Sequence, residues 1–157
     1  MLINMFAMDD RTAYIEFIEH RYFGSVTAGD VDGVLDCFDD NADIVIRHGD
    51  LPERRFSPSP RHGQDKLLSF YQHLCANYNC WFGDFHHTID IDEQLAASRF
   101  TVRLNPKANG LYAAFPEQQL LNCNFFEFAD SRIKFMLIYY SNRTEGSADK
   151  PTGYPKP

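Results

Sequence analysis

The period of the apolar residues changes along this chain, and that change constrains the fold more than any other feature. Over residues 10–28 apolar side chains recur every three or four positions, which predicts an amphipathic helix ending at Gly29. Asp30 is suited to cap a second, short helix, and residues 64–78 repeat the helical pattern. From residue 83 onward the period becomes two, which is typical of β-strands.

The strand pattern predicts a sheet that follows the helices. One strand is expected at 43–48, and the later ones at 83–92, 95–104, 111–128 and 132–143. Residues 49–63 are rich in Pro and Ser and predict an irregular loop, either a lid over a pocket or a surface insertion. Because short turns join consecutive strands, the sheet should be mostly antiparallel, with three N-terminal helices packed on it, an α+β fold.

Length and composition fit one domain with a wide, aromatic interior. The 157 residues suffice for a single domain, which we place at 1–145, with a loose lead at 1–9. The Pro-rich residues 146–157 are expected to form a tail. Aromatic residues make up 15% of the chain, with 14 Phe against one Trp, and this suggests an aromatic-lined cavity.

Charge and cysteine usage exclude several classes of function. The net charge of −7 argues against nucleic acid and anionic membranes as partners. The four cysteines form no C-x-x-C pair, and no secretory signal or apolar span of membrane length is visible, so we expect free thiols in the cytoplasm. The chain also lacks metal-binding, phosphate-loop and serine-nucleophile motifs, so no metal and no cofactor is predicted.

Several phrases resemble one superfamily by their order and spacing. They are His20-Arg21-Tyr22, the "AGDVDGVL" that begins at Ala28, "CFDDNADIVI", the "GQDKL" that opens the third helix, and "NCNFFEF". Together they resemble the nuclear transport factor 2-like fold, which includes ketosteroid isomerase, scytalone dehydratase and the SnoaL-like polyketide cyclases. The resemblance implies a cone-shaped fold whose strongly curved sheet encloses a pocket for a small, largely apolar molecule.

The resemblance also implies catalytic residues. Tyr22 lies where ketosteroid isomerases carry a tyrosine that donates a hydrogen bond to an enolate oxygen, a design for which that enzyme is a standard example. Asn124 lies at the second donor position, where an amide donates without a pKa shift. The position of the isomerase's catalytic carboxylate looks like Ile46, so the chain is not a strict ketosteroid isomerase. His48 and His87 are the substitute proton acceptors, although each can equally be a packed or solvated residue.

Further side chains are predicted to line the pocket, with core packing as the alternative for several of them. They are Asn122, Phe126 and Phe128, which share a strand face with Asn124, together with Tyr140, Tyr71 and Trp81. Neighbours in a strand face opposite sides, so at most one of His86 and His87 points inward. His87 is preferred because it shares a face with Ile89 and Ile91.

Two functions from different classes follow. The first is an isomerase, cyclase or dehydratase that acts without a cofactor on a small hydrophobic carbonyl compound. The alternative is a non-catalytic ligand-binding protein or dimeric scaffold of the same fold. The resemblance also implies a homodimer formed through the sheet.

Overall fold

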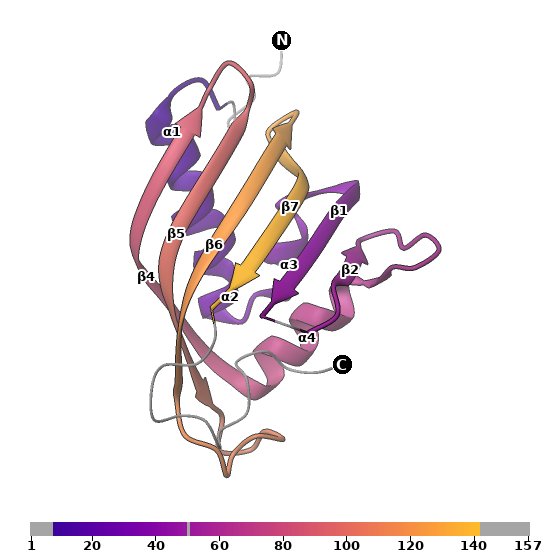
Figure 1. The fold of residues 1–157 in the computed structure, drawn as a ribbon, viewed down its shortest axis with the longest axis vertical. Coiled ribbons are helices and arrows are strands. Elements are labelled where there is room, and N and C mark those ends of the chain that lie inside the picture. The colour runs from indigo at the N-terminus through magenta and orange to yellow at the C-terminus, as the bar shows by residue number, and fades with distance from the viewer. Residues whose placement is uncertain (1–7, 50, 142–157) are drawn as a thin grey trace.

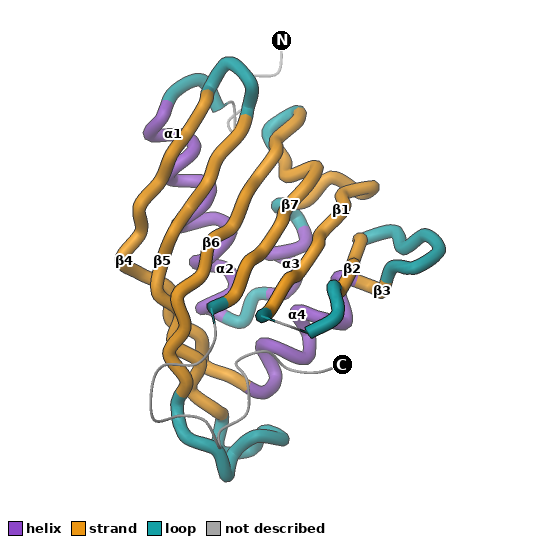
Figure 2. Tube along the Cα trace, in the orientation of Figure 1, coloured by secondary structure: helices purple, strands orange, loops and turns teal. Residues whose placement is uncertain are grey.

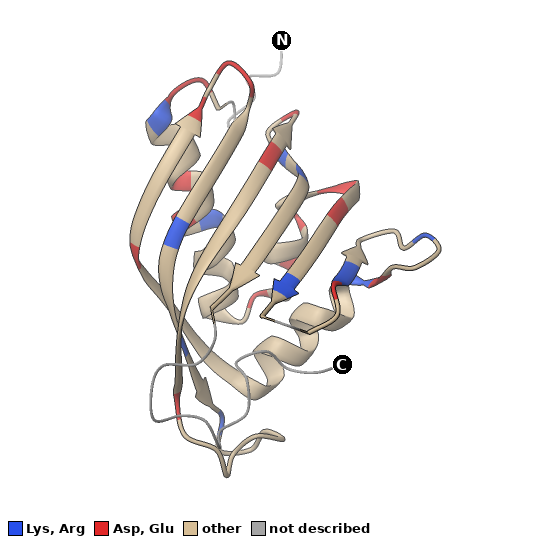
Figure 3. Ribbon diagram, in the orientation of Figure 1, with Lys and Arg blue, Asp and Glu red and all other residues tan. Residues whose placement is uncertain are grey.

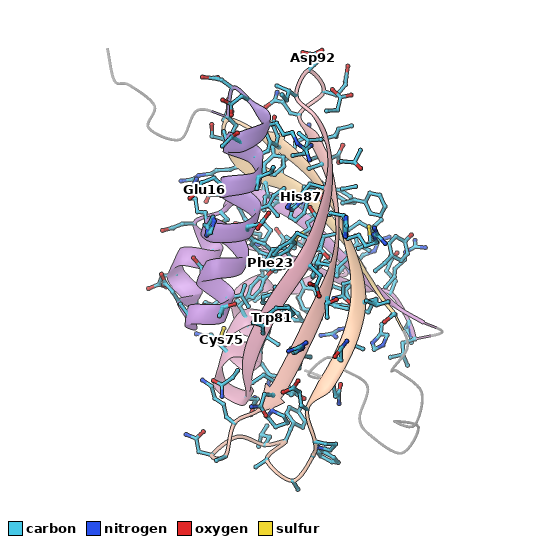
Figure 4. The ribbon with its side chains drawn as sticks, turned by 90° about the vertical axis from the view of Figure 1, so that its left-hand side faces the viewer. Glu16, Phe23, Cys75, Trp81, His87 and Asp92 are labelled. Atoms are coloured by element: carbon cyan, nitrogen blue, oxygen red, sulfur yellow. The ribbon has the colours of Figure 1, made fainter. Side chains whose placement is uncertain are left out.

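A computed structural model describes residues 8–49 and 51–141 of the chain. Seven strands form one mixed sheet in the order β3-β2-β1-β7-β6-β5-β4, and the helices lie on one face of it (Figures 1 and 4). The predicted α+β cone is confirmed. Of the predicted lead at 1–9, residues 1–7 lie outside the described part of the chain, as does the whole predicted tail at 146–157.

The first helical run matches its prediction closely. It comprises α1 (Arg11–Glu16), a π-helical segment η1 (Phe17–Phe23) and α2 (Gly24–Ala28). Asp10 caps its start by accepting a 2.8 Å hydrogen bond from the backbone N–H of Ala13. Gly29 ends it with φ +70°, the left-handed conformation that glycine adopts without steric cost. Asp30 then caps α3 (Val31–Leu35), accepting a 3.0 Å hydrogen bond from Gly33.

The region between the second and third helices holds more strand than the sequence predicted. β1 (Phe38–His48) begins five residues before the strand predicted at 43–48 and includes Asp39-Asp40-Asn41. The Pro-rich stretch 49–63 contains β2 (Arg54–Ser57), which pairs antiparallel with β1, and β3 (Asp65–Lys66) follows it. Pro52 and Pro58 flank β2 without entering it, so they leave its backbone N–H groups free to pair.

The second half of the chain is an antiparallel meander. α4 (Leu67–Asn77) leads directly into β4 (Tyr78–Asp90), which is followed by β5 (Leu95–Pro106), β6 (Gln118–Ala129) and β7 (Arg132–Tyr140). β6 starts later than predicted because residues 107–117 form a long loop, at the bottom of Figure 2. β7 then pairs parallel with β1, which joins the meander to the first strands.

The core lies between the helices and the sheet. In β6 the even-numbered residues from 118 to 128 are buried, so Asn122, Asn124, Phe126 and Phe128 share the inner face that alternation predicted. Phe23 of η1 packs against Phe100 of β5 with ring centroids 4.7 Å apart, and Figure 4 shows Phe23 between the two layers. Each such buried ring contributes about 1.5–3 kcal/mol relative to exposure.

Many of the charged residues lie at turns and at the ends of strands (Figure 3). The turn between β4 and β5 carries Asp92 and Glu93, both exposed. No helix in the described part of the chain has the length and apolar character needed to cross a membrane.

Candidate functional site

A small buried cavity lies between the helices and the inner face of the sheet. Its volume is about 20 Å³, roughly the space of one water molecule. Its lining is Tyr22, Phe23, Val26, Phe70, Tyr71, Leu74, Phe82, Phe100, Asn122, Asn124, Ile138 and Tyr140. The polar atoms in this otherwise apolar wall belong to three phenols and two amides, so the cavity offers hydrogen-bond donors in a water-poor setting.

Two phenols meet at the floor of the cavity. Tyr22 comes from η1 and Tyr71 from α4, and their hydroxyl oxygens are 2.5 Å apart, so one hydroxyl donates to the other. Both side chains are buried, and the rings of Phe23 and Phe126 pack edge-on against Tyr22. Burial raises the pKa of Tyr22 well above its ordinary value, and the hydrogen bond with Tyr71 offsets this only in part. The phenol therefore stays protonated at neutral pH and remains a hydrogen-bond donor.

Asn124 presents the second candidate donor group. Its side chain is 2% exposed, and its Nδ2 makes one weak contact, 3.8 Å from the sulfur of Met136. Its Oδ1 accepts no hydrogen bond from the described residues. Buried amides are normally satisfied, because an unmet polar group costs about 1–3 kcal/mol. A ligand oxygen would be a better acceptor for this amide than a thioether.

A β-bulge decides which histidine of β4 faces inward. Gly83 pairs with Thr101 but His86 pairs with Arg99, so β4 carries one extra residue between them. Asp84 lies at that point with φ +55°, a left-handed conformation typical of bulges. The bulge reverses the strand's alternation, and His87 consequently faces the helices while His86 is exposed (Figure 4).

His87 lies at the centre of a hydrogen-bonded chain. Its Nε2 is 2.7 Å from a carboxylate oxygen of Glu19 on η1, and its Nδ1 is 2.8 Å from the hydroxyl of Ser98 on β5. The side chain of His87 is 5% exposed, whereas that of Glu19 is 28% exposed. When the Nε2–H group of His87 donates a hydrogen bond to the Glu19 carboxylate, Nδ1 carries no proton and can accept one. This is the tautomer that a general base needs.

The polar chain leads toward the cavity along one row of the sheet. His87 pairs with Ser98, Ser98 with Asn124, and Asn124 with Ile138. The row then continues through Ile46 to Arg54 at the far edge. Paired residues on one face have Cβ atoms about 4.5–5.5 Å apart, so Ser98 lies between His87 and the Asn124 amide, but no hydrogen bond among the described residues joins Ser98 to Asn124.

Of the residues predicted from sequence, five line the cavity together: Tyr22, Tyr71, Asn122, Asn124 and Tyr140. Phe126 lies behind them against Tyr22, and Phe128 packs farther away against Tyr14 and Phe17. His48 is buried at the end of β1 with its ring centroid 5.6 Å from that of Tyr140, but it is not part of the lining.

The prediction that Trp81 lines the pocket is corrected. Trp81 is 41% exposed and lies under the guanidinium of Arg103, at 4.7 Å. Trp81 lies before the bulge. In that part of β4 the odd-numbered residues face outward, and even-numbered ones such as Cys80 are buried. The alternation visible in the later half of the strand therefore does not extend to Trp81.

Sequence analysis missed Glu19 and Ser98. Glu19 lies 68 residues from His87 in sequence, and only its place three residues before Tyr22, on the apolar side of a helix, marks it as unusual. Ser98 carries no motif. Within the described part of the chain, no three His, Cys, Asp or Glu side chains gather as a metal site.

Comparison with known proteins places this architecture. The SalBIII epoxide hydrolase/cyclase-like enzyme, studied for pyran ring formation in the polyether salinomycin, aligns with a TM-score of 0.63 and 16% identity, over 85% of this chain and 94% of its own. A candidate polyketide cyclase from Silicibacter sp. aligns with a TM-score of 0.57 and 24% identity, over 78% and 85%. An LEH-like epoxide hydrolase from M. tuberculosis aligns with a TM-score of 0.60 and 16% identity, over 85% of this chain and 82% of its own.

At these identities the solved structures establish the fold alone. A search of the curated proteins gives no match. The model of the SnoaL-like domain matches residues 20–136, which is more than half of the chain and includes Tyr22, His87 and Asn124. The chain therefore belongs to the SnoaL-like domain family.

Proposed function

We propose that this protein binds a small, largely apolar carbonyl or aromatic molecule at the cavity, whose walls must move apart to admit it, and catalyses acid–base chemistry on it without a cofactor. The reaction would be of the isomerase, cyclase or dehydratase type. The observation that carries the proposal is the buried Tyr22–Tyr71 hydroxyl pair facing the same cavity as the Asn124 amide. The solved relatives described as cyclase-like enzymes and polyketide cyclases support the same class of chemistry.

The donors would act on charge that develops during the reaction. When a proton leaves the carbon beside a carbonyl, negative charge moves to the carbonyl oxygen. Tyr22 and Asn124 would donate hydrogen bonds to that oxygen, and such bonds are strong where water is excluded. Because Tyr71 donates to Tyr22 in one of the two orientations of the pair, it would leave the Tyr22 proton directed at the ligand.

The proton acceptor would be His87. Ile46, at the position where the isomerases carry a carboxylate, is buried in the same row as Asn124 and cannot accept a proton. His87 would act through Ser98, with Glu19 fixing the ring orientation and stabilising the protonated ring. Neither histidine lines the cavity, and His87 is favoured over His48 because Glu19 and Ser98 hold its ring in the sheet row that contains Asn124.

A non-catalytic ligand-binding role remains the second candidate, on one specific observation. None of the described residues that line the cavity is a histidine or a carboxylate. In that case the same donors would bind a carbonyl oxygen without turnover.

Exchange of α-protons distinguishes the two roles without knowledge of the natural substrate. We would follow deuterium incorporation into 2-tetralone in D₂O by NMR, with purified protein and with buffer alone. For an enzyme, the protein accelerates exchange and His87→Gln abolishes the acceleration. If 2-tetralone binds but exchanges at the buffer rate, the protein is a binding module and the catalytic proposal is wrong.

We also propose a homodimer formed through the outer face of the sheet. That face carries exposed apolar side chains on adjacent central strands, namely Leu121 and Phe125 of β6 and Tyr139 of β7. Light scattering after gel filtration should give twice the chain mass, and Leu121→Glu should shift the protein toward the monomer. A wild-type monomer would refute this arrangement.

The four free thiols support a reducing compartment, and we propose the cytoplasm.

A further inference from the structure

A second hollow lies outside the cavity, between β2, β3 and α4. It is an open groove of about 640 Å³, a volume typical of small-molecule sites. Its lining is Arg54, Phe56, Asp65, Lys66, Ser69, Phe70 and His73. The groove therefore has the space for a ligand that the cavity lacks.

Phe70 is the wall between the two hollows, since it lines both. Its ring centroid is 5.1 Å from that of Phe56 on the groove side and 5.1 Å from that of Tyr71 on the cavity side. A ligand that approached the Tyr22–Tyr71 pair from the groove would have to displace this ring. A ligand larger than a water molecule needs such a rearrangement to reach the donors.

The lining of the groove includes two cationic side chains, Arg54 and Lys66, and one exposed carboxylate, Asp65, although the chain as a whole has a net charge of −7. Lys66 takes part in none of the ion pairs formed among the described residues, whereas nearby Arg55 pairs with Glu53. Such a local field favours an anionic ligand.

Arg54 is held in place by aromatic rings. Its guanidinium carbon is 5.3 Å from the centre of the Phe56 ring and 5.5 Å from that of Phe70. The positive charge of Arg54 also acts on His73 in the same groove. Burial lowers the pKa of His73, and the nearby Arg54 charge lowers it further. A rigidly placed guanidinium is the side chain best suited to bind a carboxylate through two parallel hydrogen bonds.

Arg54 and Asn124 belong to the same inward row of the sheet. They are separated by β7 and β1, so their α-carbons are about 14 Å apart, three strand spacings of about 4.8 Å. A ligand of two or three fused rings, with an acid group at one end and an oxygen at the other, has the length to reach toward both.

We propose that the groove is the acid-binding subsite for an elongated aromatic acid, with Arg54 binding the carboxylate while the opposite end passes Phe70 into the cavity. This inference deepens the proposed function and rests on it for the role of the cavity end. The substrate is thus a carboxylic acid, and a neutral ketone occupies only part of the site.

The test compares 6-hydroxy-2-naphthoic acid with its neutral amide by calorimetric titration. The acid should bind at least about tenfold more tightly, because a charge-assisted pair replaces neutral hydrogen bonds. In Arg54→Met that ratio should fall to about one. In Arg55→Met, which removes the same charge from the adjacent residue, the ratio should be retained. Arg54→Lys is the second variant, and it should keep part of the preference if Arg54→Met does not fold.

Tyr22→Phe separates this proposal from the proposed function. Both probes carry the hydroxyl group, so this variant should weaken acid and amide equally and leave their ratio unchanged. An acid preference that survives in Arg54→Met overturns the groove proposal, even where Tyr22→Phe weakens binding. If Arg54→Met does not fold, an undiminished preference in Arg54→Lys overturns it. A preference lost in Arg54→Met beside an inert Tyr22→Phe supports the groove and refutes the cavity donors.

Discussion

The two hollows on either side of Phe70 differ in size, polarity and exposure. The cavity is buried, holds about 20 Å³ and offers phenols and amides, whereas the groove is open, holds about 640 Å³ and offers charged side chains. Different elements build them: η1, α4, β6 and β7 contribute the phenols and amides of the cavity, while β2, β3 and α4 contribute the groove. The comparison suggests that stabilising a developing charge and capturing a ligand are separate tasks here.

The largest expected effect separates the two tasks directly. Tyr22→Phe should slow the exchange of 2-tetralone by about a hundredfold, the usual consequence of losing one oxyanion donor. Arg54→Met should leave that rate within about twofold, because the ketone has no acid group for the groove to bind. NMR measurement of both rates checks this. Equal losses in the two variants would mean that cavity and groove act as one site.

The wall between the hollows should also be a major source of stability. Phe70 is 6% exposed, so Phe70→Ala should lower the free energy of unfolding by about 3–5 kcal/mol. Leu68, on the same helix but 40% exposed, provides the control, and Leu68→Ala should cost less than about 1 kcal/mol. Urea denaturation measures both. A small loss for Phe70→Ala would indicate that the wall is already loose and the hollows readily join.

The buried thiols should make the folded protein less stable at alkaline pH. Burial raises the pKa of the Cys37 and Cys80 thiols from 9.0 to about 12. Since the folded pKa is the higher one, each thiol contributes stability that is complete below pH 9 and is lost between pH 9 and 12. We expect a loss of about 1 kcal/mol per thiol between pH 8 and pH 10. Denaturation of wild type and Cys80→Ala measures it, and an equal loss in both would contradict the assignment to Cys80.

The smallest expected effect is at the outer face of β2. Arg55 forms a 2.7 Å ion pair with Glu53, but its side chain is 59% exposed. Arg55→Met should therefore change the free energy of unfolding by less than about 0.5 kcal/mol. This near-neutrality is what makes Arg55 a matched control for Arg54. A loss above about 1 kcal/mol in urea denaturation would disqualify that control.

Local patterns predicted the helices and the faces of the strands well. The spacing of apolar residues, Gly29 and Asp30 located the first helices, and alternation placed Asn122 and Asn124 inward. These features depend on neighbours in sequence, and a single sequence contains that information.

Long-range features escaped sequence analysis. The bulge at Asp84 reverses the faces of β4, so His87 faces inward as preferred, whereas Trp81, a pocket candidate of the same parity before the bulge, faces outward. The Glu19–His87 pair joins a helix to an edge strand across 68 residues of sequence, and no pattern of neighbouring residues predicts such a contact. β2 was hidden by its flanking prolines, so the groove and its Arg54 could not be foreseen.

The most direct test of the central claim is a crystal structure of the complex with 6-hydroxy-2-naphthoic acid. If the chemistry occurs in the cavity, the probe's hydroxyl oxygen will lie within hydrogen-bond distance of the Tyr22 hydroxyl and the Asn124 amide, with Phe70 turned aside. A probe bound wholly in the groove, with Phe70 in place and the 2.5 Å Tyr22–Tyr71 hydrogen bond undisturbed, would contradict the claim that the cavity is where the chemistry occurs.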